Sequence, residues 1–263
     1  MFSGVLKKMI ALHDNPVKYI LDFDKDILFL NQFIGRKLNF NKIGYCCLSC
    51  LENLEIFANG FCKKCFFESP KAGEWVMKPE LSKAHLNIQD RDLEYEKKIQ
   101  LQNHIVYLSK TSEIKVGVTR SNNKITRWID QGAIEAIELI EVPNRYLAGL
   151  AEVRLKEKFS DKTNWRKMIK SEIEDLNINE KKEIAIDTLG DEFNQYLRKD
   201  SEVINFNYQI EGEIDKIKSL SLKKSESFSG KLIGIKGQYL IFDDSSVFNV
   251  RSNEGYVAEI SIS

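Results

Sequence analysis

The sequence has no excess of charge of either sign, because 39 lysine and arginine residues are matched by 39 aspartate and glutamate residues. It therefore lacks the overall basic field that favours nucleic acid, and any such binding must come from a local patch. It also lacks an apolar run close to the roughly 18 residues that a membrane-spanning helix requires. These absences argue against a helical membrane protein and count mildly against a nucleic-acid role.

The first residues, MFSGVLKKMIALHDNP, have neither a long apolar core nor a small-residue cleavage site. We therefore expect a cytoplasmic protein with no membrane partner. Disorder is also excluded, because 43% of the residues are hydrophobic and 30% are charged, as in ordinary globular chains. A chain of 263 residues is long enough for two or three small domains.

All five cysteines lie between Cys46 and Cys65, and a reducing compartment makes disulfides among them unexpected. Cys47 and Cys50 form one C-x2-C pair, and Cys62 and Cys65 form a second. Two such pairs complete a tetrahedral zinc shell, so we predict zinc at these four cysteines, with Cys46 as an alternative first ligand. Because four thiolates leave no position for water, we expect this zinc to be structural.

The pattern of apolar residues predicts an α+β protein of six segments. The segments are an N-terminal β region (1–45), a zinc finger (46–69), a linker (70–102), a central α/β unit (103–170), a helical connector (171–200) and a small C-terminal β-barrel (201–263).

The central unit begins with HIVYLSKTSEIKVGVTR (104–120), in which two apolar runs flank a polar turn, as in a β-hairpin. Helix-compatible residues follow at 125–131, and AIELIEV (136–142) is typical of a strand. Asn144 can then cap a second helix. The expected order is strand, strand, helix, strand, helix.

This order, with polar residues at particular positions in it, resembles the GIY-YIG nucleases. In that family a hairpin presents a tyrosine from each strand, the first helix brings an arginine, and a later helix brings a metal-binding glutamate. IVY, which ends at Tyr107, stands where GIY would be, and KVG, from Lys115 to Gly117, stands where YIG would be. Arg127 and Glu152 follow in the matching order.

The resemblance implies a site for phosphodiester hydrolysis, with DNA or RNA as partner. Glu152 would hold Mg²⁺ on the phosphate, Arg127 would bind a non-bridging oxygen, and Tyr107 would orient or deprotonate the water. Gly117 would let the backbone approach the substrate closely. Lys115 departs from the family, since it replaces a tyrosine, and its amine titrates too high to be a base unless it is desolvated.

The sequence departs from the family at two further positions, and each candidate residue could also have a purely structural role. Ile105 replaces a glycine, and Gln131 stands where many of these enzymes have histidine. The hairpin tyrosine could be a plain strand aromatic, and Arg127 could pair with Asp130 or Glu135. Glu152 could pair with Lys156 at i, i+4, an arrangement worth a few tenths of a kcal/mol.

Polar and aromatic residues near this unit would form a local basic rim if they converge. Trp128 and Trp165 could stack on bases, for about 1–3 kcal/mol each, or belong to the core. The candidate nucleic-acid contacts are Arg120, Lys124, Arg145, Lys162, Asn164 and Trp165.

The strings GFCKKCF, KVGVTR, TRWIDQGA and DKTNWR resemble, together, an uncharacterised prokaryotic family of unknown function. We therefore hypothesise a nucleic-acid-processing protein, in particular a Mg²⁺-dependent endonuclease with a structural zinc finger. The alternatives are a protein that binds nucleic acid without cleaving it and a zinc-stabilised protein-interaction scaffold.

Overall fold

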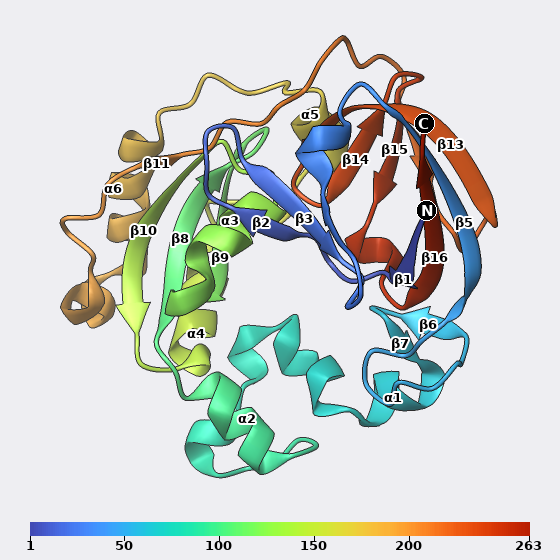
Figure 1. Ribbon diagram of the computed structural model, residues 1–263. Coiled ribbons are helices and arrows are strands. Elements are labelled where there is room, and N and C mark those ends of the chain that lie inside the picture. Colours follow the sequence, from blue (N-terminus) through green and yellow to red (C-terminus); the bar gives the residue numbers. More distant parts are fainter. The chain divides into compact units, whose positions relative to one another are not determined.

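The computed structural model describes all residues from Met1 to Ser263, which fold into two compact units. Unit 1 comprises Met1–Ala72 and Phe206–Ser263, and unit 2 comprises Gly73–Asn205. The chain has mixed α/β structure with open sheets and no closed barrel (Figure 1). No helix is both long enough and apolar enough to span a membrane.

Unit 1 contains an open seven-stranded sheet in the order β1-β16-β5-β13-β14-β15-β12. Its strands are β1 (Phe2–Val5), β5 (Lys37–Tyr45), β12 (Lys218–Leu220), β13 (Ser227–Lys236), β14 (Tyr239–Phe242), β15 (Ser246–Asn249) and β16 (Tyr256–Ile262). The small C-terminal barrel expected over 201–263 is therefore wrong. Its strands flank β5 instead, where Phe40 lies opposite both Phe228 and Ile260. Strand alternation shows which residues face a core, but it does not show which strands pair.

The rest of unit 1 is made of short elements. A three-stranded antiparallel sheet lies near the N-terminus, with Tyr19 and Leu21 buried. The cysteine region forms a hairpin followed by a helix, and single 3₁₀ turns complete the unit. These elements are β2 (Ile10–Leu12), β3 (Lys18–Asp22), β4 (Ile27–Phe29), η1 (Leu30–Phe33), β6 (Ile56–Ala58), β7 (Phe61–Cys62), α1 (Lys63–Glu68), η2 (Pro70–Ala72) and η8 (Arg251–Asn253).

Unit 2 contains a four-stranded sheet in the order β11-β10-β8-β9, with β9 at one edge. The order strand, strand, helix, strand, helix is present as expected. Asn144 caps α4, since its Oδ1 accepts from the Leu147 N–H at 3.0 Å. The elements are β8 (His104–Lys110), β9 (Ile114–Arg120), η6 (Ser121–Asn123), α3 (Lys124–Asp130), β10 (Glu135–Val142), α4 (Arg145–Leu155), α5 (Trp165–Ile169), α6 (Ile178–Leu189), η7 (Asp191–Tyr196) and β11 (Ile204–Asn205).

Residues 73–102 of the segment expected as a linker are part of unit 2 and include several short helices. A Cβ on Gly149 of α4 would lie only 2.2 Å from the backbone nitrogen of Glu80, so the two backbones are in close contact. Gly149 makes this approach possible because it has no side chain. The helices are η3 (Glu74–Val76), η4 (Pro79–Leu81), η5 (Ala84–Leu86) and α2 (Leu93–Gln100).

Candidate functional sites

The four cysteines of the two C-x2-C pairs converge in unit 1. The sulfur atoms of Cys47, Cys50, Cys62 and Cys65 all lie within 4.8 Å of one another. Cys46 is not part of this group, and its thiol donates to the Leu51 carbonyl at 3.6 Å. The four sulfurs could hold a zinc ion, and the spare cysteine is the one at position 46.

The four thiols of the cluster differ in pKa because their surroundings differ. Burial raises the pKa of the Cys47 thiol, but backbone N–H groups from Cys50, Cys62 and Ser49 lower it to about 6. One of these is the Cys62 N–H, 3.3 Å from the Cys47 sulfur. Burial and the neighbouring thiols raise the pKa of Cys65 to about 12. A bound cation would favour the thiolate at all four positions.

A second group of polar side chains converges around β9 of unit 2. Tyr107 lies opposite Gly117, and a Cβ at Gly117 would lie 2.6 Å from the tyrosine Oη. The space beside Gly117 thus holds the tyrosine ring. Tyr107 donates to Gln131 Oε1 at 3.1 Å and accepts from Arg127. Its ring packs edge-on against the buried Trp128, with centroids 5.6 Å apart.

Lys115 is buried in the same group, with 4% of its surface exposed. Burial and, to a lesser extent, the charge of Arg127 lower the pKa of its amine to about 7, against the opposing charges of Asp161 and Glu152. Asp161 is brought near because the Val116 N–H donates to the Ser160 carbonyl at 3.0 Å. Lys115 is therefore desolvated, which is what a lysine needs in order to act as a base near neutral pH.

We expect Lys115→Met to be more stable than the wild type at pH 7 and below. The lysine pKa is about 7 in the folded chain against an ordinary 10.5, so unfolding takes up a proton between these values. The wild-type free energy of unfolding consequently rises with pH between these two values. The difference in free energy of unfolding between Lys115→Met and the wild type therefore becomes smaller. Urea unfolding from pH 6 to 9.5 measures the gap. The exposed Lys158→Met serves as control, and a gap for Lys115→Met that does not change with pH contradicts the prediction.

Arg145, Gly149 and Glu152 of α4 and its C-cap residue Lys156 lie on one face of the helix, at i, i+4, i+7 and i+11 spacing. Burial raises the pKa of Glu152, and the Lys156 ammonium at 3.6 Å opposes that shift. The i, i+4 pair that the sequence allowed is thus present, and Lys156 also lies 3.2 Å from Asp161. The charge of Glu152 acts on Tyr107 and Lys115 as well, so its carboxylate belongs to the cluster.

Arg145 joins the cluster to the segment that precedes α2. Its Nε donates to the Trp75 carbonyl at 3.0 Å, and its Nη2 donates to the Val76 carbonyl at 2.8 Å. Burial lowers the pKa of Arg145 to about 10; the Glu152 charge opposes this, whereas Arg127 and Arg120 reinforce it. The guanidinium is therefore fixed by two carbonyl groups and lies near both like charges (Arg127 and Arg120) and carboxylates (Glu152 and Glu80).

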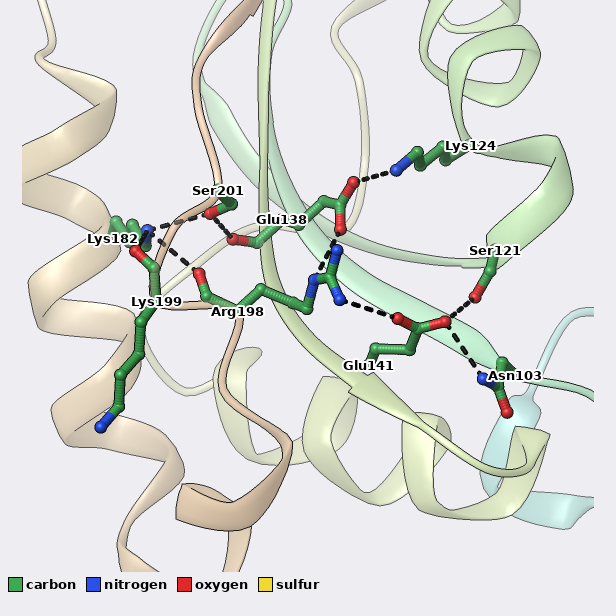
Figure 2. Close-up of polar contacts among 9 residues, drawn as sticks. All are labelled: Asn103, Ser121, Lys124, Glu138, Glu141, Lys182, Arg198, Lys199 and Ser201. Carbon is green, nitrogen blue, oxygen red and sulfur yellow. Dashed lines mark hydrogen bonds and ion pairs between the residues drawn. The ribbon is translucent and has the colours of Figure 1, made fainter.

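The four cations of the cluster, Lys115, Arg120, Arg127 and Arg145, form no ion pair within 4.0 Å. They are neighbours nonetheless. The charge of Arg127 lowers the pKa of Lys115 and that of Arg145, and the charge of Arg120 also lowers the pKa of Arg145. Figure 2 shows the contrast on β10, where Lys124 and Arg198 both pair with Glu138. Lys124, expected at a nucleic-acid surface, is thus engaged with a buried carboxylate.

The other expected contacts make local interactions. Lys162 and Asn164 are exposed, and Asn164 Oδ1 caps α5 by accepting from the Lys167 N–H at 3.3 Å. The Trp165 ring lies beneath the Arg166 guanidinium, 4.3 Å away. None of the interactions described for the cluster includes these three residues.

Sequence reasoning missed Glu80 of η4, whose charge acts on both Arg145 and Lys156. It also missed His104, which is fully buried on β8. Glu80 lies in a charged stretch without periodicity, so no local pattern indicated it. The one available signal was Gly149, a helix-interior glycine that needs a packing reason.

Unit 2 is thus an open-sheet α/β unit with a polar cluster at its edge strand, and unit 1 carries a four-cysteine cluster. The chain belongs to a family described as "Protein of unknown function (DUF2797)", which matches residues 35–258. This agrees with the expected resemblance to a family of unknown function. Comparison with curated proteins and with solved structures gave no match.

Proposed function

We propose that the cluster around β9 binds the phosphodiester backbone of a nucleic acid and hydrolyses it, in the manner of the GIY-YIG nucleases. The observation that carries this proposal is the group of four cations, Lys115, Arg120, Arg127 and Arg145, without ion pairs. Like charges that lie close together and are partly buried repel one another, which costs stability in the free protein. A phosphate group would relieve that repulsion, and guanidinium groups suit its oxygens.

Each residue then has a role that its surroundings support. Arg127 binds a non-bridging phosphate oxygen and is oriented by its hydrogen bond to Tyr107. Mg²⁺ bound at Glu152 would polarise the phosphate, and one carboxylate with water and phosphate oxygens is a common shell for that ion. Burial raises the pKa of Tyr107, so its hydroxyl stays protonated and positions Arg127.

Lys115 is the better candidate to accept a proton from the attacking water. It lies in the cluster beside Arg127, and a pKa of about 7 leaves a large neutral fraction at neutral pH. The lysine that replaces the second tyrosine of the hairpin would therefore carry the basic function itself.

The second candidate is a protein that binds nucleic acid without cleaving it. It is favoured by the ion pair between Glu152 and Lys156, since a lysine at 3.6 Å competes with a metal for the carboxylate. The cation group serves this function equally well, so binding and cleavage have to be measured separately.

The test is binding and cleavage of labelled DNA and RNA, single-stranded, duplex and branched, with Mg²⁺ or Mn²⁺. We expect log K to fall linearly with log salt concentration. Arg127→Gln should weaken binding of every sequence and reduce that slope by about 1. The exposed Arg251→Gln, in unit 1, should behave as wild type. Absence of binding at low salt overturns the proposal, and binding without product leaves only the second candidate.

A further inference from the structure

Gln131 is the residue of the cluster that the proposed function leaves without a role. It follows the last residue of α3, one helical turn after Arg127, at i, i+4 spacing. The end of the helix fixes its backbone, because the Gln131 N–H donates to the Trp128 carbonyl at 3.3 Å and Gly132 then turns the chain with a φ of +71°. Arg127 and Gln131 therefore reach the sheet from one face of one helix, and both contact Tyr107.

The contact that they share is the hydroxyl of Tyr107, which is completely buried. A phenol has one proton to donate, and this hydroxyl donates to Gln131 Oε1 at 3.1 Å. Its oxygen accepts from the Arg127 guanidinium. Arginine has only N–H donors, so the tyrosine proton cannot point to it, and the glutamine oxygen rather than the amide nitrogen has to face the hydroxyl. The hydrogen bonds thus run in one direction, from Arg127 through Tyr107 to Gln131.

This direction determines what the tyrosine can do. With its proton directed at Gln131, the hydroxyl offers lone pairs to the guanidinium and no proton to a substrate. The ring has no room to turn away, since it lies beside Gly117 and packs against Trp128 with centroids 5.6 Å apart. The alignment of Arg127 therefore depends on an acceptor at position 131 that carries no charge, because a carboxylate there would pair with the arginine itself.

We infer that Gln131 is a positioning residue for the proposed reaction: by accepting the hydrogen bond of Tyr107, it keeps the phenol oxygen directed at Arg127 and so aims the guanidinium at the phosphate. The inference rests on the proposed function and adds a residue to it. It leaves Lys115, and not Tyr107, to accept the proton of the attacking water.

Three variants test this role, namely Gln131→Met, Tyr107→Phe and the two together. Gln131→Met leaves a buried hydroxyl without an acceptor, so it should lose stability and slow single-turnover cleavage by about tenfold, the effect of one lost hydrogen bond. Tyr107→Phe should slow cleavage to the same extent. The double variant contains neither member of the buried pair, so its stability should recover, whereas its cleavage should stay about tenfold slow because both residues act through one contact.

The measurements are urea unfolding and single-turnover cleavage of the same DNA and RNA substrates, with saturating protein and Mg²⁺. Gln195→Met, at an exposed glutamine of η7 in unit 2, is the matched control and should behave as the wild type does. If the wild type binds these substrates without cleaving them, affinity replaces the rate in the same comparison, since Arg127 is the phosphate contact in both candidate functions.

Three outcomes overturn the inference and differ from failure of the proposed function. If Gln131→Met cleaves and binds as the wild type does, the glutamine has no role at the site. If the double variant regains cleavage together with stability, Gln131 serves only the fold. If the two single effects multiply to about a hundredfold, Gln131 acts independently of Tyr107. Failure of the wild type to bind any nucleic acid removes the proposed function itself, and this inference with it.

Discussion

Glu152→Gln is expected to lower metal-dependent cleavage by about 10³-fold while binding of nucleic acid is kept. Glutamine has the shape of glutamate but lacks the charge that would hold Mg²⁺ beside the phosphate. The folded state should not suffer, because burial raises the pKa of Glu152 and its ionised form is the costly one. Single-turnover cleavage with saturating protein measures the effect directly, and urea unfolding measures stability.

Glu157→Gln is the matched control, since Glu157 is exposed just beyond the end of α4. It should cleave as the wild type does. The substitution of Glu152 also removes a negative charge 3.6 Å from Lys156, which keeps Asp161 as its partner at 3.2 Å, and this should strengthen binding of the polyanion slightly. Equal cleavage rates for Glu152→Gln and the wild type would rule out a metal role for this carboxylate.

The second large effect is expected at the cysteines. Cys62→Ser should release zinc and lower the unfolding midpoint of unit 1, because Cys62 combines two roles in the cluster. Its sulfur lies with the other three, and its N–H donates to Cys47. Apparent binding energies of structural zinc in small fingers are on the order of 10 kcal/mol or more, so losing one ligand should cost several kcal/mol.

Zinc content per chain and thermal unfolding with and without chelator measure this effect. Cys46→Ser is the control, since the Cys46 sulfur lies outside the group of four. It should keep one zinc per chain and the wild-type midpoint. A wild-type protein purified with all five cysteines reduced and no zinc would contradict the assignment.

The parts of unit 2 that could be predicted are those that local residues determine. Asn144 indicated the start of α4, because a cap acts on the next turn of its own helix. The alternation in 104–120 indicated the hairpin, whereas its register, which places Tyr107 opposite Gly117, comes from the structure alone.

The parts that could not be predicted depend on contacts between distant segments. The pairing of β5 with β13 and β16 turned an expected barrel into an open sheet, and no residue in 201–263 specifies that partner. Glu80 reaches the cluster only because its backbone packs on Gly149, some seventy positions later in the chain. The burial of Lys115, which changes its chemistry, depends on the loop at Ser160 and on α4.

The insertion of unit 2 within unit 1 has a consequence for how the chain is made. Residues 73–205 are contiguous, so they can fold as soon as they leave the ribosome. β5 emerges earlier but pairs with β13 and β16, which follow roughly 200 residues later, or about 10–40 s at ordinary rates of synthesis. During that interval β5 has two unpaired edges, which invite association with other nascent chains. The domain made first is therefore completed last, and its yield should depend on chaperones more than that of the inserted domain.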